Sequence, residues 1–164
     1  MGAQTKYSFF TPIGVAGGIV DLAPYAIDTF LNEEETGKMK FGLGVIQGTT
    51  AGKQVKLPAS AEGKFEGVTT NNLTTEYDLE GKIHVRKGVA IGVMRYGRIY
   101  VRVADQKTPK YGDPLYVVAT GAEAGYFTTD AASNIEVAGR FLGTVSDGIA
   151  EAELFNAPQP VADP

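Results

Sequence analysis

Short apolar or alternating stretches, each closed by turn residues, recur over the last two-thirds of this chain. They are rich in Val, Ile, Phe and Tyr and are bounded by Gly, Asp, Asn and Pro. This pattern is typical of β-strands joined by tight turns and not of helices. The predicted strands are residues 41–47, 64–69, 83–86, 89–94, 98–104, 114–119, 125–129, 137–145 and 149–155. The pattern predicts a mainly β protein, either a small antiparallel β-barrel or a β-sandwich.

Three pairs of these strands are predicted to form β-hairpins, with connections at residues 95–97, 121–125 and 146–148. The last connection is Ser-Asp-Gly, which strongly favours a turn. In residues 98–103, β-branched side chains alternate with polar or amphipathic ones, so one face is predicted to be buried. Near the end of the chain, Glu151 and Glu153 alternate with apolar residues and are predicted to face solvent.

The first 37 residues differ from the rest because Pro and Gly interrupt every periodic stretch. We predict an extended N-terminal arm at 1–37, a β body at 38–155, and a flexible, proline-rich C-terminal tail at 156–164. Apolar residues spaced four apart predict at most one short helix, from residue 24 to about residue 34. The acidic residues 33–35 are predicted to be a solvated end of this helix or a loop.

Composition narrows the class of protein. With 43% hydrophobic and 21% charged residues, the chain matches a single folded globular domain, and its 21 glycines fit many tight turns. A net charge of −4 argues against direct binding to nucleic acid or to an anionic membrane, because both require clustered Lys and Arg. No stretch matches a membrane span or a signal peptide, so synthesis in the cytoplasm is expected. We therefore expect a protein partner.

Few residues of the sequence are candidates for catalysis or for binding a metal ion or a phosphate. The chain has no cysteine, and its one histidine, His84, is predicted to be structural because no second ligand accompanies it. The glycines at 14–18 have the wrong spacing for a phosphate-binding loop and are predicted to form a flexible turn. Paired carboxylates among Glu76, Asp78 and Glu80 would suit glycoside hydrolysis or calcium binding, but nothing in the spacing supports either. The sequence predicts no enzyme, cofactor or metal site.

The order of these elements resembles the structural cement, or capsid decoration, proteins of tailed bacteriophages. Single motifs such as the Gly-Asp-Pro-Leu-Tyr-Val at 112–117 are common, so the resemblance depends on their joint order and spacing from about residue 15 to residue 155. The matching segments are 16–21, 32–34, 41–49, 65–69, 88–103, 112–117, 125–128, 139–142 and 148–152.

This resemblance implies a small, β-tulip-like barrel or sandwich that binds the outer surface of the assembled head without enzymatic activity. It implies the major capsid protein as partner, a location in the virion, and self-association as a homotrimer, with a dimer as the alternative. Two other functions stay open. One is a tail or baseplate component. The other is a ligand-binding or hydrolytic barrel, which requires a pocket where carboxylates or His84 converge.

Five apolar residues of the arm are predicted to anchor the protein to the capsid. They lie in a segment too interrupted to form its own core, as expected of a segment that docks on a neighbour. The five are Ile19, Leu22, Tyr25, Phe30 and Leu31. An arm of this kind would bridge two capsid subunits, so that separating them also breaks the contacts of the cement protein.

Overall fold

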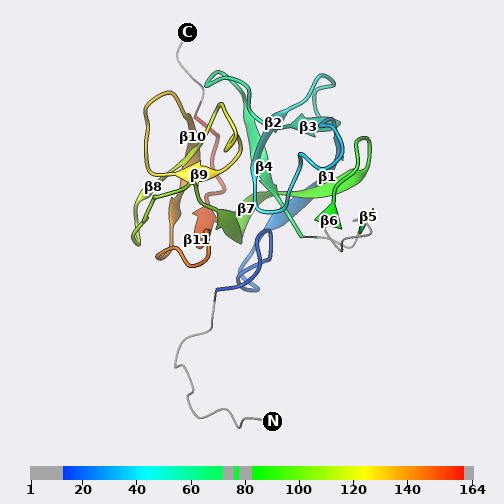
Figure 1. The fold of residues 1–164 in the computed structure, drawn as a ribbon. Coiled ribbons are helices and arrows are strands. Elements are labelled where there is room, and N and C mark those ends of the chain that lie inside the picture. The colour runs from blue at the N-terminus through cyan, green and yellow to red at the C-terminus, as the bar shows by residue number, and fades with distance from the viewer. Residues whose placement is uncertain (1–12, 72–75, 78–82, 161–164) are drawn as a thin grey trace.

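The computed structural model describes residues 13–71, 76–77 and 83–160, and it arranges most of their strands as two groups that share one long strand, beside a separate pair of short strands (Figure 1). None of the described residues is in a helix, so the mainly β prediction is confirmed. In chain order the strands are β1 (Ala26–Asn32), β2 (Gly44–Gln47), β3 (Gln54–Lys56), β4 (Phe65–Thr69), β5 (Glu76–Tyr77), β6 (Ile83–His84), β7 (Ala90–Arg102), β8 (Pro114–Val117), β9 (Phe127–Thr128), β10 (Ile135–Phe141) and β11 (Ile149–Leu154).

The first group closes on itself as a five-stranded barrel. Its order is β1-β3-β2-β4-β7, and β7 pairs back to β1. All of these pairings are antiparallel except β1 with β3, which is parallel. The closure confirms the predicted small barrel. Its interior is filled by the buried side chains of Phe30, Met39, Val45, Val55, Val85, Ile91 and Val93.

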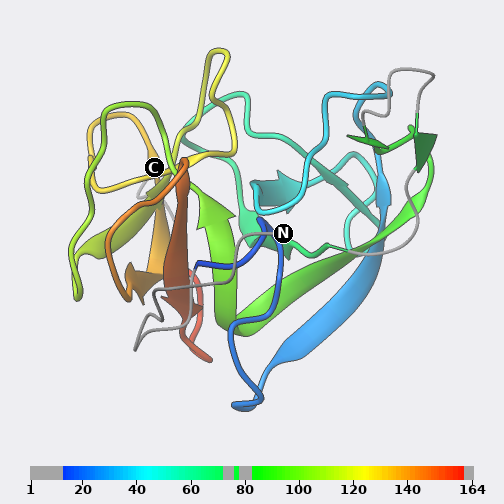
Figure 2. The same cartoon turned by 60° about the horizontal axis from the view of Figure 1, so that its bottom comes forward.

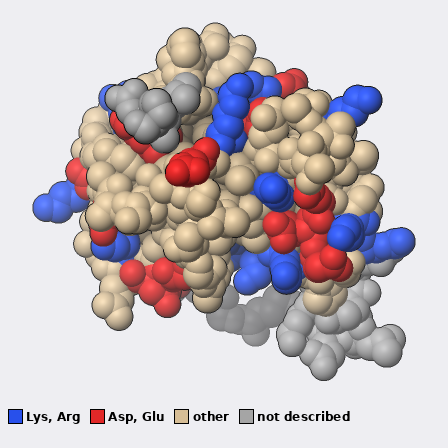
Figure 3. All heavy atoms as spheres, turned by 90° about the horizontal axis from the view of Figure 1, so that it is seen from above, with Lys and Arg blue, Asp and Glu red and all other residues tan. Residues whose placement is uncertain are grey.

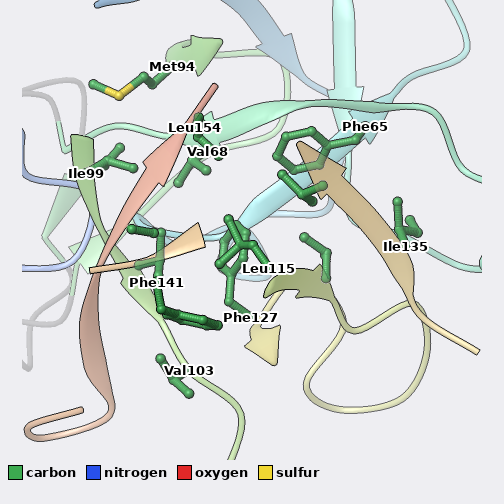
Figure 4. Close-up of a cluster of buried hydrophobic side chains, with 14 of the residues drawn as sticks. Phe65, Val68, Met94, Ile99, Val103, Leu115, Phe127, Ile135, Phe141 and Leu154 are labelled. Carbon is green, nitrogen blue, oxygen red and sulfur yellow. The ribbon is translucent and has the colours of Figure 1, made fainter. Parts of the chain in front are cut away.

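The second group extends the sheet in the order β7-β11-β10-β8-β9. Its far end returns to the end of β7 through one bridge between Val103 and Phe127. Phe127, Phe141 and Leu115 are central in its core (Figure 4). Phe65 of β4, a barrel strand, belongs to the same cluster. The cluster inside the barrel is thus separate from a second cluster, which packs the barrel against the second group of strands and holds the two together.

Strand β7 corrects one sequence prediction. Residues 90–102 form a single continuous strand, so the predicted hairpin with a turn at 95–97 is wrong. The strand changes partners at Gly97: the half before it pairs with β1, and the half from it onward pairs with β11. Gly97 has a φ of 121°, which other residues rarely adopt. The sequence Arg-Tyr-Gly suggested a turn because glycine is common in turns. Glycine also permits a bend within a continuous strand, which is its role here.

Strand β1 corrects a second prediction, since residues 26–32 are extended and not helical. The spacing of four between Ala26 and Phe30 suggested a helix, but the β-branched Ile27 and Thr29 favour a strand. Pairing with β7 from Ala26 to Leu31 stabilises the extended form. Thus the last part of the predicted arm is a strand of the barrel.

Other local predictions agree with the structure more closely. β8 pairs with β9, and β10 pairs with β11, as antiparallel neighbours. The turn before β11 is confirmed: Asp147 and Gly148 both have positive φ, and Ser146 and Ile149 exchange two backbone hydrogen bonds of 2.9 Å. Two short strands, β3 and β5, lie outside the segments that were predicted to be strands.

The end of β1 is tied to the barrel by a buried asparagine. Asn32 is only 1% exposed, and its backbone N–H donates to the carbonyl of Val89. Its side-chain Nδ2 donates to the carbonyl of Arg86 at 2.9 Å, and its Oδ1 accepts the N–H of Glu34 at 3.0 Å. Each of these bonds satisfies a polar group that would otherwise be buried without a partner.

The three acidic residues that follow bind three different segments instead of ending a helix. Glu33 accepts hydrogen bonds from the hydroxyl and the N–H of Thr49, and these bonds hold the pKa of Glu33 below its ordinary value. Glu34 accepts the N–H of Leu57 at 3.0 Å. Glu35 pairs with Lys87 at 2.6 Å. The acidic residues thus connect the end of β1 to the β2–β3 region and to the start of β7.

Candidate docking surface

One whole edge of β7 is covered by the chain before β2. Gly17 donates its N–H to the carbonyl of Tyr100 at 2.7 Å, Tyr100 donates to the carbonyl of Gly18 at 2.9 Å, and Val20 donates to that of Arg98 at 3.1 Å. β1 then continues along the same strand. We call residues 13–32 the N-terminal ribbon. Its two anchored parts are joined by a loop, residues 21–25, which projects from the molecule (Figure 2).

Close packing explains the glycines of the ribbon, which were predicted to be a flexible turn. A Cβ atom on Gly14 would lie 2.5 Å from the ring of Tyr100. Gly17 has a φ of 78°, and a Cβ atom there would lie 2.7 Å from the backbone nitrogen of Asn71. The small residues therefore let the backbone lie directly against the body, so this segment is an anchor and not a flexible turn.

The ribbon exposes apolar side chains along its length. It carries six of the eight large hydrophobic residues that are exposed among the described residues. Their exposed fractions are 62% for Val15, 39% for Ile19, 96% for Leu22, 41% for Tyr25, 37% for Ile27 and 43% for Leu31. Clustered exposed apolar residues mark interaction sites more often than scattered ones do. We call these six residues the candidate docking surface.

The docking surface contains four of the five predicted anchor residues, and the structure corrects the fifth. Phe30 is 5% exposed and packs inside the barrel, because alternation along β1 directs it away from the face of Ile27 and Leu31. Sequence reasoning missed Val15 and Ile27. For Ile27 the signal was the alternation within residues 26–32, which was interpreted as helical.

A chain of charged side chains holds the projecting loop. The Asp21 carboxylate accepts the N–H of Ala23 at 3.0 Å and pairs with Arg98 of β7 at 2.7 Å. Arg98 also pairs with Glu153 of β11 at 3.3 Å, and Glu153 pairs with Arg140 of β10 at 2.8 Å. The loop that carries Leu22 is thus connected to three strands of the body.

These contacts shift the acidity of both carboxyl groups. The hydrogen bond from the Ala23 N–H, followed by the bond from Arg98, lowers the pKa of Asp21. Burial alone would raise the pKa of Glu153, but hydrogen bonds from Arg140 and Arg98 outweigh it and lower the pKa. Both carboxyl groups therefore favour the charged, paired form.

Acid should release the loop. Because the folded-state pKa of Asp21 is below its ordinary value of 3.8, its stabilising contribution is present above that value. The contribution is lost as pH falls through the lowered pKa. Asp21→Asn keeps an acceptor for Ala23 but removes the charge, so we expect the variant to melt below the wild type at neutral pH. The two melting temperatures should converge in acid, and a difference that stays constant with pH would contradict the assignment.

The described residues also contain a groove of about 480 Å³ between the start of β4, the middle of β7 and residues 155–160. Glu66 lines it, and Arg95 pairs with Glu66 at 3.3 Å and with Asp28 at 3.3 Å. Within the described ranges, no group of three or more His, Cys, Asp or Glu residues is placed to hold a metal ion. Of the predicted acidic run, Asp78 and Glu80 lie outside the described residues.

The charged side chains do not form an extended field of one sign on the face shown in Figure 3. There, Lys and Arg are interspersed with Asp and Glu and with uncharged surface. In the part of the chain that the structure describes, no helix is long and apolar enough to cross a membrane.

The barrel and its exposed ribbon define a mainly β protein with a candidate docking surface, and the comparisons identify its family. Residues 3–155 match the family described as "Structural cement protein (E217 gp24/Pam3 gp6)". The chain therefore belongs to the phage structural cement protein family, and it is a structural protein of a phage virion.

A comparison with solved structures agrees on the fold. A chain from the structure "The capsid of Myoviridae Phage XM1" matches with a TM-score of 0.71 at 19% sequence identity. The match covers 95% of this chain and 99% of that chain. At this level of identity the likeness shows a shared fold. A comparison with curated proteins found none that matches this chain.

Proposed function

We propose that this protein decorates the outer surface of the assembled phage head and bridges neighbouring major capsid subunits. In this role it stabilises the head against the pressure of packaged DNA and performs no catalysis. The observation that carries the proposal is the docking surface, six exposed apolar side chains on a ribbon that is anchored along β7. Membership of the cement family supports it.

Burial of the docking surface would supply binding free energy. Removing apolar area from water contributes roughly 25 cal/mol per Å², and Leu22 at 96% exposed has nearly all of its side-chain area still to bury. The backbone bonds of residues 17–20 and the Asp21–Arg98 pair order the ribbon before it binds. Little conformational entropy is then lost on association, which favours affinity.

Bridging between subunits explains how binding of this protein would stabilise the shell. A protein that contacts two capsid subunits binds the assembled shell and not the separated subunits, so it shifts the equilibrium toward the shell. We propose that copies of this chain associate as a homotrimer, with a dimer as the alternative. In such a cluster each copy contacts a different subunit, and the linked contacts reinforce one another.

The proposal predicts that purified protein, added to heads that lack it, binds to them and delays their rupture. At a free concentration of 100 times Kd, each occupied site should add about 2.7 kcal/mol to the stability of the shell. Bound copies are counted by electron microscopy, and rupture is followed by DNA release on heating. Equal binding to unassembled capsid subunits, or binding that leaves the rupture temperature unchanged, would contradict the bridging role.

A further inference from the structure

The outer edge of β1 is open over most of its length. β1 pairs with β7 from Ala26 to Leu31, whereas β3 lies opposite only its last two residues, Leu31 and Asn32. The first five residues of β1 therefore have a strand on one side only, within the part of the chain that the structure describes. Figure 2 shows this end of β1 running along the rim of the molecule.

The hydrogen bonds at the end of β1 show which backbone groups face this edge. Asn32 donates its N–H to the carbonyl of Val89 on the β7 side, while Leu31 donates to the carbonyl of Lys53 on the opposite side. Successive residues of a strand direct their backbone groups to alternate sides. Ile27 and Thr29 therefore direct their N–H and C=O groups outward, the same way as Leu31.

Strand β1 has few of the features that usually prevent an exposed edge from pairing with another strand. In natural edge strands, lysine, proline, strong bulges or a covering loop prevent such pairing. The strand Ala-Ile-Asp-Thr-Phe-Leu-Asn contains no lysine and no proline, and its one charge, Asp28, is paired with Arg95 at 3.3 Å. Its single register shift lies at the end, between Ala26 and Ile27. An edge of this kind is ready to pair with another strand.

We propose that this edge binds an extended segment of a capsid subunit, which adds to the barrel as a β-strand beside β1. The inference rests on the proposed function and names the partner segment for the same surface. Backbone bonds to Ile27 and Thr29 would set the register. The exposed Ile27 and Leu31 side chains, on the outer face of β1, would select apolar residues at alternate positions of the incoming strand.

Two observations favour a capsid segment over a second copy of β1. The open edge is continuous with the docking surface, since Leu22 and Tyr25 lie just before it and Ile27 lies on it. In addition, a two-fold antiparallel pairing that bonds Ile27 of one copy to Thr29 of the other places Asp28 opposite Asp28. Like charges directly across a pair of strands are destabilising.

A backbone-directed substitution tests the proposal. Thr29→Pro removes one outward N–H but no β1–β7 hydrogen bond, because Thr29 faces away from β7. Thr29→Val is the matched control that keeps the N–H and a similar shape. We expect Thr29→Pro to weaken binding to heads that lack the protein by about ten-fold, and Thr29→Val to bind like the wild type. Circular dichroism and melting temperature check that both variants fold.

Hydrogen exchange provides a second measurement that needs no variant. The amides of Ile27 and Thr29 should exchange fast in the free protein and slowly on heads. Leu22→Ser, which removes the exposed apolar side chain of the projecting loop, serves as a reference for docking. Fast exchange in both states, or normal binding of Thr29→Pro while Leu22→Ser binds weakly, would overturn the added strand and leave the proposed function intact. Slow exchange of these amides in the free protein would also overturn the proposal. If the exchange rate fell with rising protein concentration, a second copy would be covering the edge of β1. If it did not change with concentration, another part of the same chain would be covering it.

Discussion

Replacing Leu22 with serine should weaken binding to heads by ten- to a hundred-fold without changing the melting temperature of the free protein. Leu22 is 96% exposed, so the fold gains little from its side chain. Burying a leucine side chain contributes about 1.5–3 kcal/mol, which corresponds to this loss of affinity. Binding to heads that lack the protein can be measured by co-sedimentation over a range of protein concentrations.

Leu22→Met is the matched control for this experiment. Methionine keeps an apolar side chain of similar size, so this variant should bind nearly as well as the wild type. Equal affinity of the serine variant and the wild type would show that the loop does not contact the capsid. A lower melting temperature for the serine variant would indicate instead that Leu22 is buried in an assembly of this chain.

Replacing Gly17 with alanine should lower the free energy of unfolding by roughly 3 kcal/mol and weaken head binding as well. The backbone of Gly17 has a φ of 78°, and an added Cβ would lie 2.7 Å from the nitrogen of Asn71 and 2.8 Å from the carbonyl oxygen of Thr69. Both neighbours are backbone atoms, which cannot move aside without shifting the chain. The ribbon would then detach from β7, and the docking surface would lose its ordered support.

Gly52 offers a matched control for this substitution. Its φ is 73°, close to that of Gly17, but no heavy atom lies within 4 Å of an added Cβ. Gly52→Ala therefore measures the conformational cost alone, which we expect to be about 1 kcal/mol. Urea unfolding of both variants separates the two effects. Equal destabilisation would show that close packing against the body contributes nothing at Gly17.

Most of the strands were predictable from local pattern. Neighbouring residues alone explain three examples. These are the turn Ser146-Asp147-Gly148, the alternation of Ile99 and Val101 in β7, and the apolar strand β8. Turn residues restrict φ, and alternation matches the two faces of a strand, so these signals do not depend on distant partners. The resemblance to cement proteins also depended on these local elements, in their order.

The two main errors in the predicted secondary structure lie where strands far away in sequence decide the local conformation. Ala26–Asn32 carries both a spacing of four and an alternation, and only pairing with β7 decides between them. Arg95-Tyr96-Gly97 carries turn chemistry, yet the strand continues because β1 and β11 are available on either side of Gly97. Tertiary context overrides weak local preference at both places.

For the docking surface, local pattern was enough to indicate which segment carries the exposed apolar residues, because a stretch broken by Gly and Pro cannot bury all of its own apolar side chains. Which of these residues face water depends on contacts with the rest of the fold. The alternation of β1 directs Phe30 into the barrel and Ile27 out of it, and the glycines at 14, 17 and 18 let the ribbon lie against Tyr100 and the residues around Thr69. Exposure depends on what packs against a side chain, and those neighbours come from parts of the chain far away in sequence.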